Sequence, residues 1–277
     1  MRILISADME GITGVTNLLD TTPRTPGWER FRPIMTRDAN AAIAGAFDGG
    51  ATEVIVVEAH YGHRNILIEE LDERAKLLTG RHKRFGMLEG IDRGIDLVFL
   101  VGYHAPAGTA GTLSHTFFAA ALTELRLNGE TCSETRMMAT LAGEFGAGVG
   151  IVTGDDVAAA DAAKYIPGVK TVIVKEATDR FTAICLPPKR TEKLIRAAAA
   201  EAVSSPAAHP PLRIQPPFVW DARWVSTASA KAASHVPGVE LVDPHSLHWV
   251  CPDMKTSHDI FTIVAALAGG AIEERFV

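Results

Sequence analysis

The sequence predicts an α/β fold, a three-layer αβα arrangement around a mostly parallel sheet, with a smaller C-terminal α+β subdomain. Short apolar runs rich in β-branched residues are typical of strands that are buried on both faces. Helix-like segments separate these runs, and strands that alternate with helices form largely parallel sheets. The strand-like runs lie at residues 2–7, 53–57, 96–101, 149–153 and 170–174.

The segments between these strands are expected to form the following elements. Three prolines make residues 12–35 loop-like, and Thr36 is expected to N-cap a helix that ends near Gly49. The pair Asn128-Gly129 predicts a hairpin turn within residues 119–134. A helix at about 66–73, a strand at 75–78 and a helix at 134–145 complete this part.

The character of the chain changes after Pro187-Pro188. We therefore expect residues 1–187 to form a metal-binding catalytic core and residues 188–277 to form a subdomain packed on it, within what can count as one domain overall. The second part is expected to contain a charged helix at 189–203, a Pro-rich segment, a strand, a helix at 221–234, strands near 239–250 and a helix at about 255–275.

Composition excludes several classes of protein. A net charge of −6 disfavours binding to nucleic acid, and the densest basic stretch, Arg81 to Arg84, is short and is interpreted as solvated surface. Three scattered cysteines without a CxxC pair argue against a disulfide framework and fit a reducing compartment. We expect no signal peptide and no transmembrane helix, because strand-like residues start at once and apolar runs are short. A cytoplasmic enzyme is the expectation.

Acidic and imidazole side chains follow four of the predicted strands. In open α/β sheets the ligand site lies beyond the carboxyl ends of the strands, so these side chains are expected at one rim. Carboxylates and imidazoles without cysteine suit zinc or another first-row metal in a catalytic site, and this many can hold two metals. Each residue alone has a structural alternative, such as a hydrogen-bonded loop residue or, for the aspartate pair, a turn or helix cap. The residues are Asp8 and Glu10, Glu58 and His60, His104, and Asp155 and Asp156.

Two further residues are candidates for the same rim. His115 follows a Gly-rich loop and is a candidate acid/base or oxyanion stabiliser; the alternative is a surface histidine. Glu134 begins a predicted helix and is a candidate ligand; the alternative is a carboxylate that the helix dipole favours.

Four motifs, taken in order, resemble those of the DppA-type D-aminopeptidases, a family of self-compartmentalising zinc metallopeptidases. They are SADMEG at 6–11, GYHA at 102–105, SHT at 114–116 and NGETCSE at 128–134. The resemblance spans much of the chain, including GDD at 154–156 and PGVELVD at 237–243. It implies an aminopeptidase that hydrolyses N-terminal residues, D-amino acids among them, from short peptides or aminoacyl amides. It also implies two Zn²⁺ per subunit, with Mn²⁺ or Co²⁺ as other candidates.

The resemblance also implies roles for individual residues. Asp8 would bridge two metals, Glu10 and His104 would complete one site, and His60 and Glu134 would complete the other. His115 would be the catalytic histidine. The assembly implied is a homo-oligomer, a decamer of two stacked pentameric rings.

One stretch departs from the family pattern. Many relatives have Asn-Asp-Ser-His where this chain has Val57-Glu58-Ala59-His60. The ligand histidine is kept, whereas its altered neighbours put the groups that orient the imidazole in doubt. Glu58 is the candidate to replace the missing aspartate at a longer reach.

Other functions remain open at this point. A di-metal phosphoesterase or another amide hydrolase would use a similar site, although few basic side chains beyond Arg64 stand near the rim to hold phosphate. A non-catalytic assembly protein stabilised by metal is the alternative outside enzymes.

Overall fold

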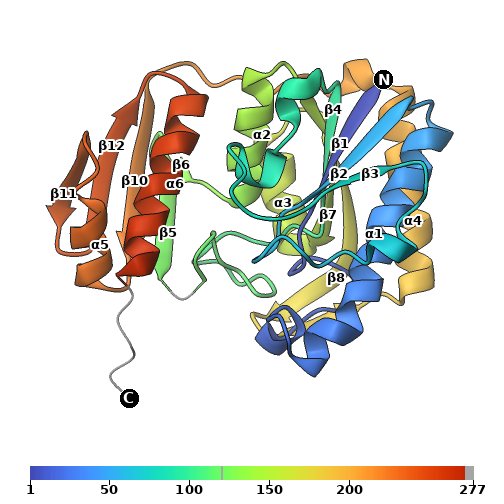
Figure 1. Ribbon diagram of the computed structural model, residues 1–277, viewed down its shortest axis with the longest axis horizontal. Helices are drawn as coiled ribbons and strands as arrows, with labels where there is room; N and C mark the ends of the chain where they lie inside the picture. The colour runs from blue at the N-terminus through green and yellow to red at the C-terminus, as the bar shows by residue number, and fades with distance from the viewer. Residues whose placement is uncertain (120, 272–277) are drawn as a thin grey trace.

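A seven-stranded sheet forms the centre of the larger part of the molecule in the computed structural model, which describes residues 1–119 and 121–271 (Figure 1). Its strand order is β3-β2-β1-β4-β7-β8-β9, and all neighbours are parallel except the last pair. This confirms the expected α/β class. The strands are β1 (Arg2–Ala7), β2 (Glu53–Glu58), β3 (Lys76–Leu78), β4 (Leu97–Val101), β7 (Gly148–Asp155), β8 (Lys170–Asp179) and β9 (Thr182–Cys185).

Helices cover both faces of this sheet. Helices α1 (Pro26–Asp48) and α4 (Pro188–Ser204) pack together on one face, where one apolar cluster fills the interface. Helices α2 (Glu134–Glu144) and α3 (Asp156–Tyr165) cover the other face (Figure 1). None of the helices in the described parts of the chain combines the length and apolar character that a bilayer crossing needs.

A second, five-stranded antiparallel sheet packs beside α2 (Figure 1). A single apolar cluster runs from the large sheet through α2 into this small sheet, where the buried rings of Trp220 and Trp249 stack at 5.9 Å. Helices α5 (Thr227–Ala233) and α6 (Met254–Gly270) pack on the small sheet. Its strands are β11 (Val239–Asp243), β12 (Ser246–Cys251), β10 (Phe218–Trp224), β5 (Leu122–Leu127) and β6 (Glu130–Thr131).

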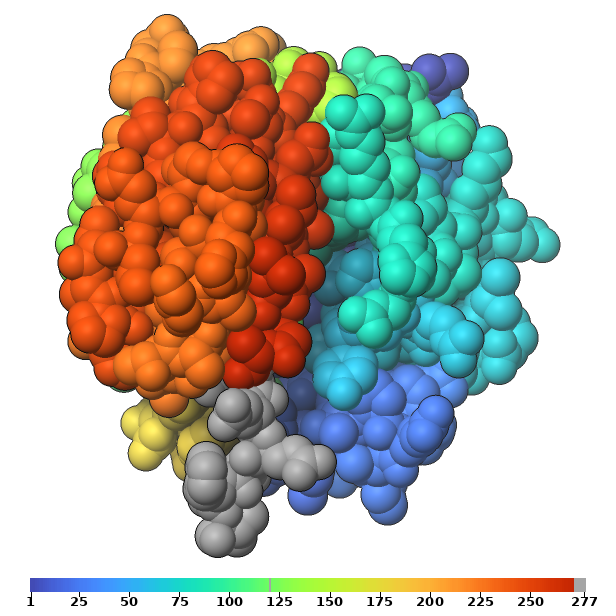
Figure 2. All heavy atoms as spheres, turned by 60° about the vertical axis from the view of Figure 1, so that its left-hand side comes forward, coloured from blue at the N-terminus to red at the C-terminus, as the bar shows by residue number. Residues whose placement is uncertain are grey.

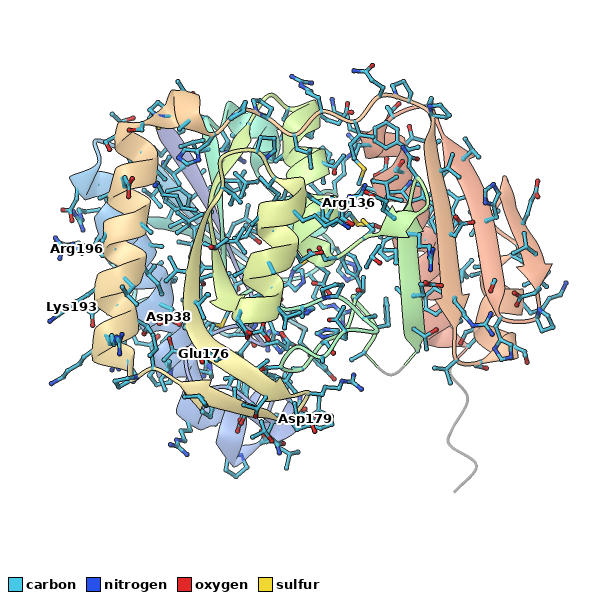
Figure 3. The ribbon with its side chains drawn as sticks, turned by 180° about the vertical axis from the view of Figure 1, so that it is seen from behind. Asp38, Arg136, Glu176, Asp179, Lys193 and Arg196 are labelled. Atoms are coloured by element: carbon cyan, nitrogen blue, oxygen red, sulfur yellow. The ribbon has the colours of Figure 1, made fainter. Side chains whose placement is uncertain are left out.

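The two halves of the chain contribute to both sheets. Helix α4, expected in the C-terminal part, lies on the large sheet. Its Arg196 forms an ion pair with Asp48 of α1, and Figure 3 shows Arg196 on the outer side of α4. Strands β5 and β6, from the first part, belong to the small sheet. Arg136 of α2 donates to the Thr131 carbonyl oxygen at 2.9 Å and so joins α2 to β6 (Figure 3). The division of the chain at residues 187 and 188 stays a prediction.

Several predicted boundaries were wrong. Helix α1 begins at Pro26 rather than after Thr36, because the Thr25 hydroxyl caps it by accepting from Trp28 N at 3.1 Å. A proline at the first helical position loses no intrahelical bond, so this proline begins a helix instead of preventing one.

Other elements are shorter than expected or had been missed. The helix predicted at 66–73 is only a 3₁₀ turn, Ile68–Glu70. The helix predicted at 221–234 is α5 alone, because residues 221–224 extend β10. The β8–β9 hairpin was missed. The last helix is described only to Gly270, and its predicted residues 272–275 lie outside the described part of the chain.

Candidate metal centre

The carboxyl ends of three adjacent strands meet at one edge of the large sheet. Strand β1 lies between β2 and β4, so Asp8, His60 and His104, which follow these strands, come together. Glu134 reaches the same place from the first residue of α2, and His115 from the loop after β4. These residues and Glu10 are all buried, with at most 8% of each residue exposed.

Two glycines allow the loops after β1 and β4 to cross closely. Gly11 N donates to the Gly102 carbonyl oxygen at 2.8 Å. A Cβ on Gly11 would lie 1.8 Å from the Tyr103 carbonyl oxygen, and Gly102 has φ +75°, which L side chains rarely adopt. Side chains at these positions would separate Asp8 from His104.

Asp8 directs one carboxylate oxygen toward each of two histidines. Its Oδ1 lies 3.3 Å from His60 Nδ1, and its Oδ2 lies 3.5 Å from His104 Nε2. A glutamate completes each side: Glu10 Oε2 is 2.9 Å from His60 Nδ1, and Glu134 Oε1 is 3.3 Å from His104 Nε2. The centre therefore has two imidazole–carboxylate pairs with Asp8 between them.

His115 stands over this pair of sites. Its ring stacks on His104 with centroids 3.9 Å apart and an interplanar angle of 10°. Its Nε2 lies 3.9 Å from both Glu10 Oε1 and Glu134 Oε1. His115 is thus placed against both sides of the centre.

Backbone carbonyls fix the orientation of all three imidazoles. His60 Nε2–H donates to the Thr21 carbonyl oxygen at 2.8 Å. The Nδ1–H groups of His104 and His115 donate to the carbonyl oxygens of Ala105 at 3.1 Å and Leu113 at 2.8 Å. Since a carbonyl oxygen only accepts, each ring presents its other nitrogen to the carboxylates.

The donor set fits metal ions. Lone pairs of imidazole nitrogens and carboxylate oxygens repel one another at these distances unless positive charge lies between them. Glu10 Oε2 and His104 Nε2 are buried and make no hydrogen bond, despite the close approach of His60. Two sets of three residues bring their donor atoms together, with one atom from each residue within 4.8 Å of the other two. The sets are Asp8, Glu10 and His104, and His104, His115 and Glu134. Nitrogen and oxygen donors of this kind are those of catalytic zinc sites.

The electrostatics also show that the centre attracts positive charge. Burial and the neighbouring Glu10 charge raise the pKa of Asp8 to about 7. Burial would lower the pKa of His104, but the Glu134 and Asp8 carboxylates outweigh it and raise that pKa to about 10. Burial and the charge of His104 lower the pKa of His115.

Glu58 supports the loop that carries His60. Its carboxylate accepts from Asn65 N and Ile66 N at 2.6 Å each and from Asn65 Nδ2 at 2.8 Å. Asn65 Nδ2 also donates to the His60 carbonyl oxygen at 2.9 Å. Glu58 therefore acts on the backbone of His60, whereas Thr21 orients the imidazole.

The aspartate pair after β7 has two different roles. Asp155 caps α3 by accepting from Ala158 N at 2.7 Å, and it also accepts from Thr112 N at 2.6 Å, which anchors the loop that carries His115. Asp156 accepts from Ala177 N at 2.7 Å and ties α3 to β8. The structure thus connects Asp155, but not Asp156, to the loop of the centre.

Sequence reasoning missed Lys175. This buried lysine of β8 donates from Nζ to the carbonyl oxygens of Glu10 at 2.6 Å, Ile12 at 3.2 Å and Val15 at 2.6 Å. It fixes the backbone that follows Asp8, and burial lowers its pKa to about 8. The available signal was a lysine placed directly after the apolar run Val172–Val174.

A cleft of about 960 Å³ lies above the centre. Figure 2 shows the surface hollowed between α6, in red, and segments of the first hundred residues, in blue and cyan. Asp8, Glu10, His115 and Glu134 line the cleft together with largely apolar groups. Among the apolar groups are Met87, Phe117, Phe118, Phe261 and Ala265.

Known proteins resemble the chain over nearly its full length. The model of the peptidase M55 family, described as D-aminopeptidase, matches residues 1–263. A D-aminopeptidase of Bacillus subtilis (strain 168) is 32% identical over 269 residues, which covers 97% of this chain and 98% of that protein. The solved structure of the Zn-dependent D-aminopeptidase DppA from Bacillus subtilis, described as a self-compartmentalizing protease, superimposes with a TM-score of 0.94. It is 31% identical, and the match covers 99% of this chain and 100% of the other. This chain therefore belongs to the D-aminopeptidase family and is a metal-dependent aminopeptidase.

Proposed function

We propose that the protein uses zinc to release N-terminal D-amino acids from short peptides or aminoacyl amides. The observation that carries this proposal is the arrangement of two imidazole–carboxylate pairs around Asp8 on the floor of a cleft. The solved relative's description as a Zn-dependent D-aminopeptidase supports the choice of metal and substrate.

Two metal ions per subunit match the two sides of the centre. Asp8 would bridge them, with His60 and Glu10 on one side and His104 and Glu134 on the other. The shortest contacts support this pairing. The pairing implied by family resemblance, in which Glu10 partnered His104, corresponds to the wider group of Asp8, Glu10 and His104, and we prefer the shorter contacts. Bound metals supply Lewis acidity, which polarises the scissile carbonyl and lowers the pKa of water. Mn²⁺ and Co²⁺ accept the same nitrogen and oxygen donors.

His115 is the proposed proton carrier. Its Nδ1–H is held by the Leu113 carbonyl oxygen, so its Nε2 faces the centre as an acceptor. This nitrogen is therefore placed to take a proton and to deliver it to the leaving amine. Phe117 N donates to Glu134 Oε1 at 2.5 Å, which holds the carboxylate beneath the His115 ring.

The proposed assembly is a homo-oligomer, specifically a decamer of two pentameric rings. The description of the solved relative as self-compartmentalizing supports the oligomer. Large exposed apolar side chains at the cleft mouth, Leu18 (58% exposed) and Tyr61 (69%), are suited to contact with another subunit. We also propose a cytoplasmic location, which the free cysteines Cys132, Cys185 and Cys251 support.

A panel of substrates tests this function. The protein is stripped with chelator, and zinc, manganese or cobalt is restored before hydrolysis of matched D- and L-dipeptides, aminoacyl amides and phosphate esters is measured. We expect zinc to restore cleavage of the D-dipeptides and D-aminoacyl amides. Hydrolysis that is unaffected by chelation, or restricted to phosphate esters, would contradict the proposal.

A further inference from the structure

The basic stretch Arg81 to Arg84 lies mostly at the surface, as expected, but its side chains have different environments. Lys83 donates from Nζ to the Glu58 carbonyl oxygen at 2.7 Å, and the Arg84 guanidinium lies 5.3 Å from the Phe85 ring centroid. Arg81 instead lines the cleft above the metal centre, as does His63. One basic residue of this stretch therefore faces the space where the substrate binds.

A short chain of hydrogen bonds connects Arg81 to the metal centre. His63 N donates to the His60 carbonyl oxygen at 2.8 Å, and Gly80 N donates to the His63 carbonyl oxygen at 2.8 Å. The Thr79 hydroxyl donates to the same carbonyl oxygen. Each of these bonds joins backbone segments whose Cα atoms lie about 5 to 7 Å apart, so the backbone of Gly80, next to Arg81, lies at most two such steps from that of His60. Roughly three or four residues of extended peptide cover this span.

The guanidinium of Arg81 is available to a ligand. Its residue is exposed, and within residues 1–119 and 121–271 it forms no ion pair. His63 Nδ1, beside it in the cleft, is buried and has no hydrogen-bond partner in the same residues. The planar guanidinium fork matches a carboxylate in a bidentate way, and an imidazole nitrogen adds a further polar contact.

We propose that Arg81, together with His63, binds the C-terminal carboxylate of the substrate. The favoured substrates are then short peptides with a free C-terminus, whose N-terminal residue lies at the metal centre while the carboxylate lies at Arg81. The Phe117 and Phe261 side chains, which line the same cleft, contact the substrate side chains between these two ends. This inference rests on the proposed function and names the substrate class of that site.

The test compares tri-D-alanine, whose length matches this span, with its C-terminal amide on the zinc enzyme. We expect the wild-type enzyme to prefer the free acid. Arg81→Ala should raise KM for the free acid by at least about tenfold, the size of one lost charge-assisted contact, with kcat little changed. KM for the amide should stay within about twofold of wild type, and Arg81→Lys should recover part of the loss.

Arg84→Ala is the matched control, because that arginine stacks on Phe85 instead of lining the cleft. Its kinetics should equal those of wild type, and zinc content and melting temperature should be unchanged in all variants. Equal losses on both substrates, or no loss on either, would overturn the carboxylate site. A wild-type enzyme that cleaves the amide as well as the free acid would overturn it too, while leaving the proposed function intact. Cleavage of neither substrate would overturn both.

Discussion

Asp8 and Glu10 leave the same strand end but have unequal environments. Asp8 has one oxygen near His60 and the other near His104, whereas Glu10 makes its shortest approach to His60. This difference follows from the position of β1 between β2 and β4. Asp8 is the first residue after β1 and therefore lies between the ends of β2 and β4. A bridging role for Asp8 is what this geometry supports.

Metal content tests the bridging role. Asp8→Ala should lose both zinc ions, because each site loses a ligand, whereas Glu10→Ala should weaken chiefly the site that contains His60. Elemental analysis after dialysis gives the number of ions per subunit. Asp92→Ala, at an exposed position of the 3₁₀ turn Ile91–Arg93 before β4, is the control and should retain two. Equal losses in the Asp8 and Glu10 variants would count against the bridge.

His115 differs from the other two histidines in its proposed task. His115→Ala should leave zinc content intact and lower kcat by about 10² to 10⁴, the usual contribution of a positioned acid/base. Steady-state kinetics on a D-dipeptide measures the loss. His82→Ala, at a surface position of the basic stretch, serves as the control. Normal turnover in His115→Ala would remove this residue from the mechanism.

At the scale of elements, the centre depends on loops that approach one another closely. Gly11→Ala would place a Cβ 1.8 Å from the Tyr103 carbonyl oxygen, so the β1 and β4 loops must separate. We expect a loss of roughly 3 kcal/mol in unfolding free energy and weakened zinc binding. Urea denaturation and zinc titration measure the two effects. Gly62→Ala, which meets nothing within 4 Å, should change neither; a stable, zinc-replete Gly11→Ala protein would refute the crossing argument.

The contact between β8 and the loop after β1 makes stability depend on pH. Burial lowers the pKa of Lys175 to about 8 from its usual 10.5, so between these values the unfolded chain holds a proton that the folded protein lacks. Stability therefore rises with pH in this window. Compared with Lys175→Met, the wild-type protein should gain up to roughly 3 kcal/mol from pH 8 to 10.5.

Urea denaturation of the chelated wild-type and Lys175→Met proteins across pH 7.5 to 10.5 measures this gain. Lys170→Met on the same strand is the control, because that lysine is partly exposed and pairs with Glu201 at the surface. Parallel pH profiles for wild type and Lys175→Met would mean that folding does not lower the pKa of this lysine.

At the scale of the whole molecule, elements that belong to the large sheet and elements that pack on the small sheet together form the cleft. The residues proposed to hold metal come from the large sheet and from α2, whereas α6 on the small sheet forms the opposite wall (Figure 2). One continuous apolar cluster holds the two parts together. The depth of the cleft therefore depends on packing between the sheets and not on either sheet alone.

The proposed assembly has a direct test. A decamer should sediment with about ten times the 29.6 kDa subunit mass. Replacing the exposed apolar residues Leu18 and Tyr61 by Asp should shift it toward smaller species, because charge opposes burial in an interface. The exposed Leu241→Asp, on the edge strand β11, is the comparison variant. A wild-type monomer in sedimentation velocity would contradict the proposed oligomer.

The sequence by itself determined the class of fold and the residues of the centre. Apolar runs mark buried strands, and parallel strands have to end at one edge, so Asp8, His60 and His104 could be brought together without coordinates. The start of α1 at Thr25-Pro26 was harder to predict. Proline breaks a helix when it lies in the interior but begins one when it lies at the first position, and the sequence alone does not show which position Pro26 has.

Only the tertiary structure shows which groups support the centre and which of its side chains lie closest to one another. The Thr21 carbonyl that orients His60, and the three carbonyls that Lys175 holds, are backbone groups with no residue signature. The closeness of Glu10 to His60 depends on side-chain direction after the strand has ended, where the alternation of a strand no longer applies. The position of Arg81 at the cleft could not be predicted either. Hydrogen bonds to residues distant in sequence set the path of its loop, and the neighbouring residues do not.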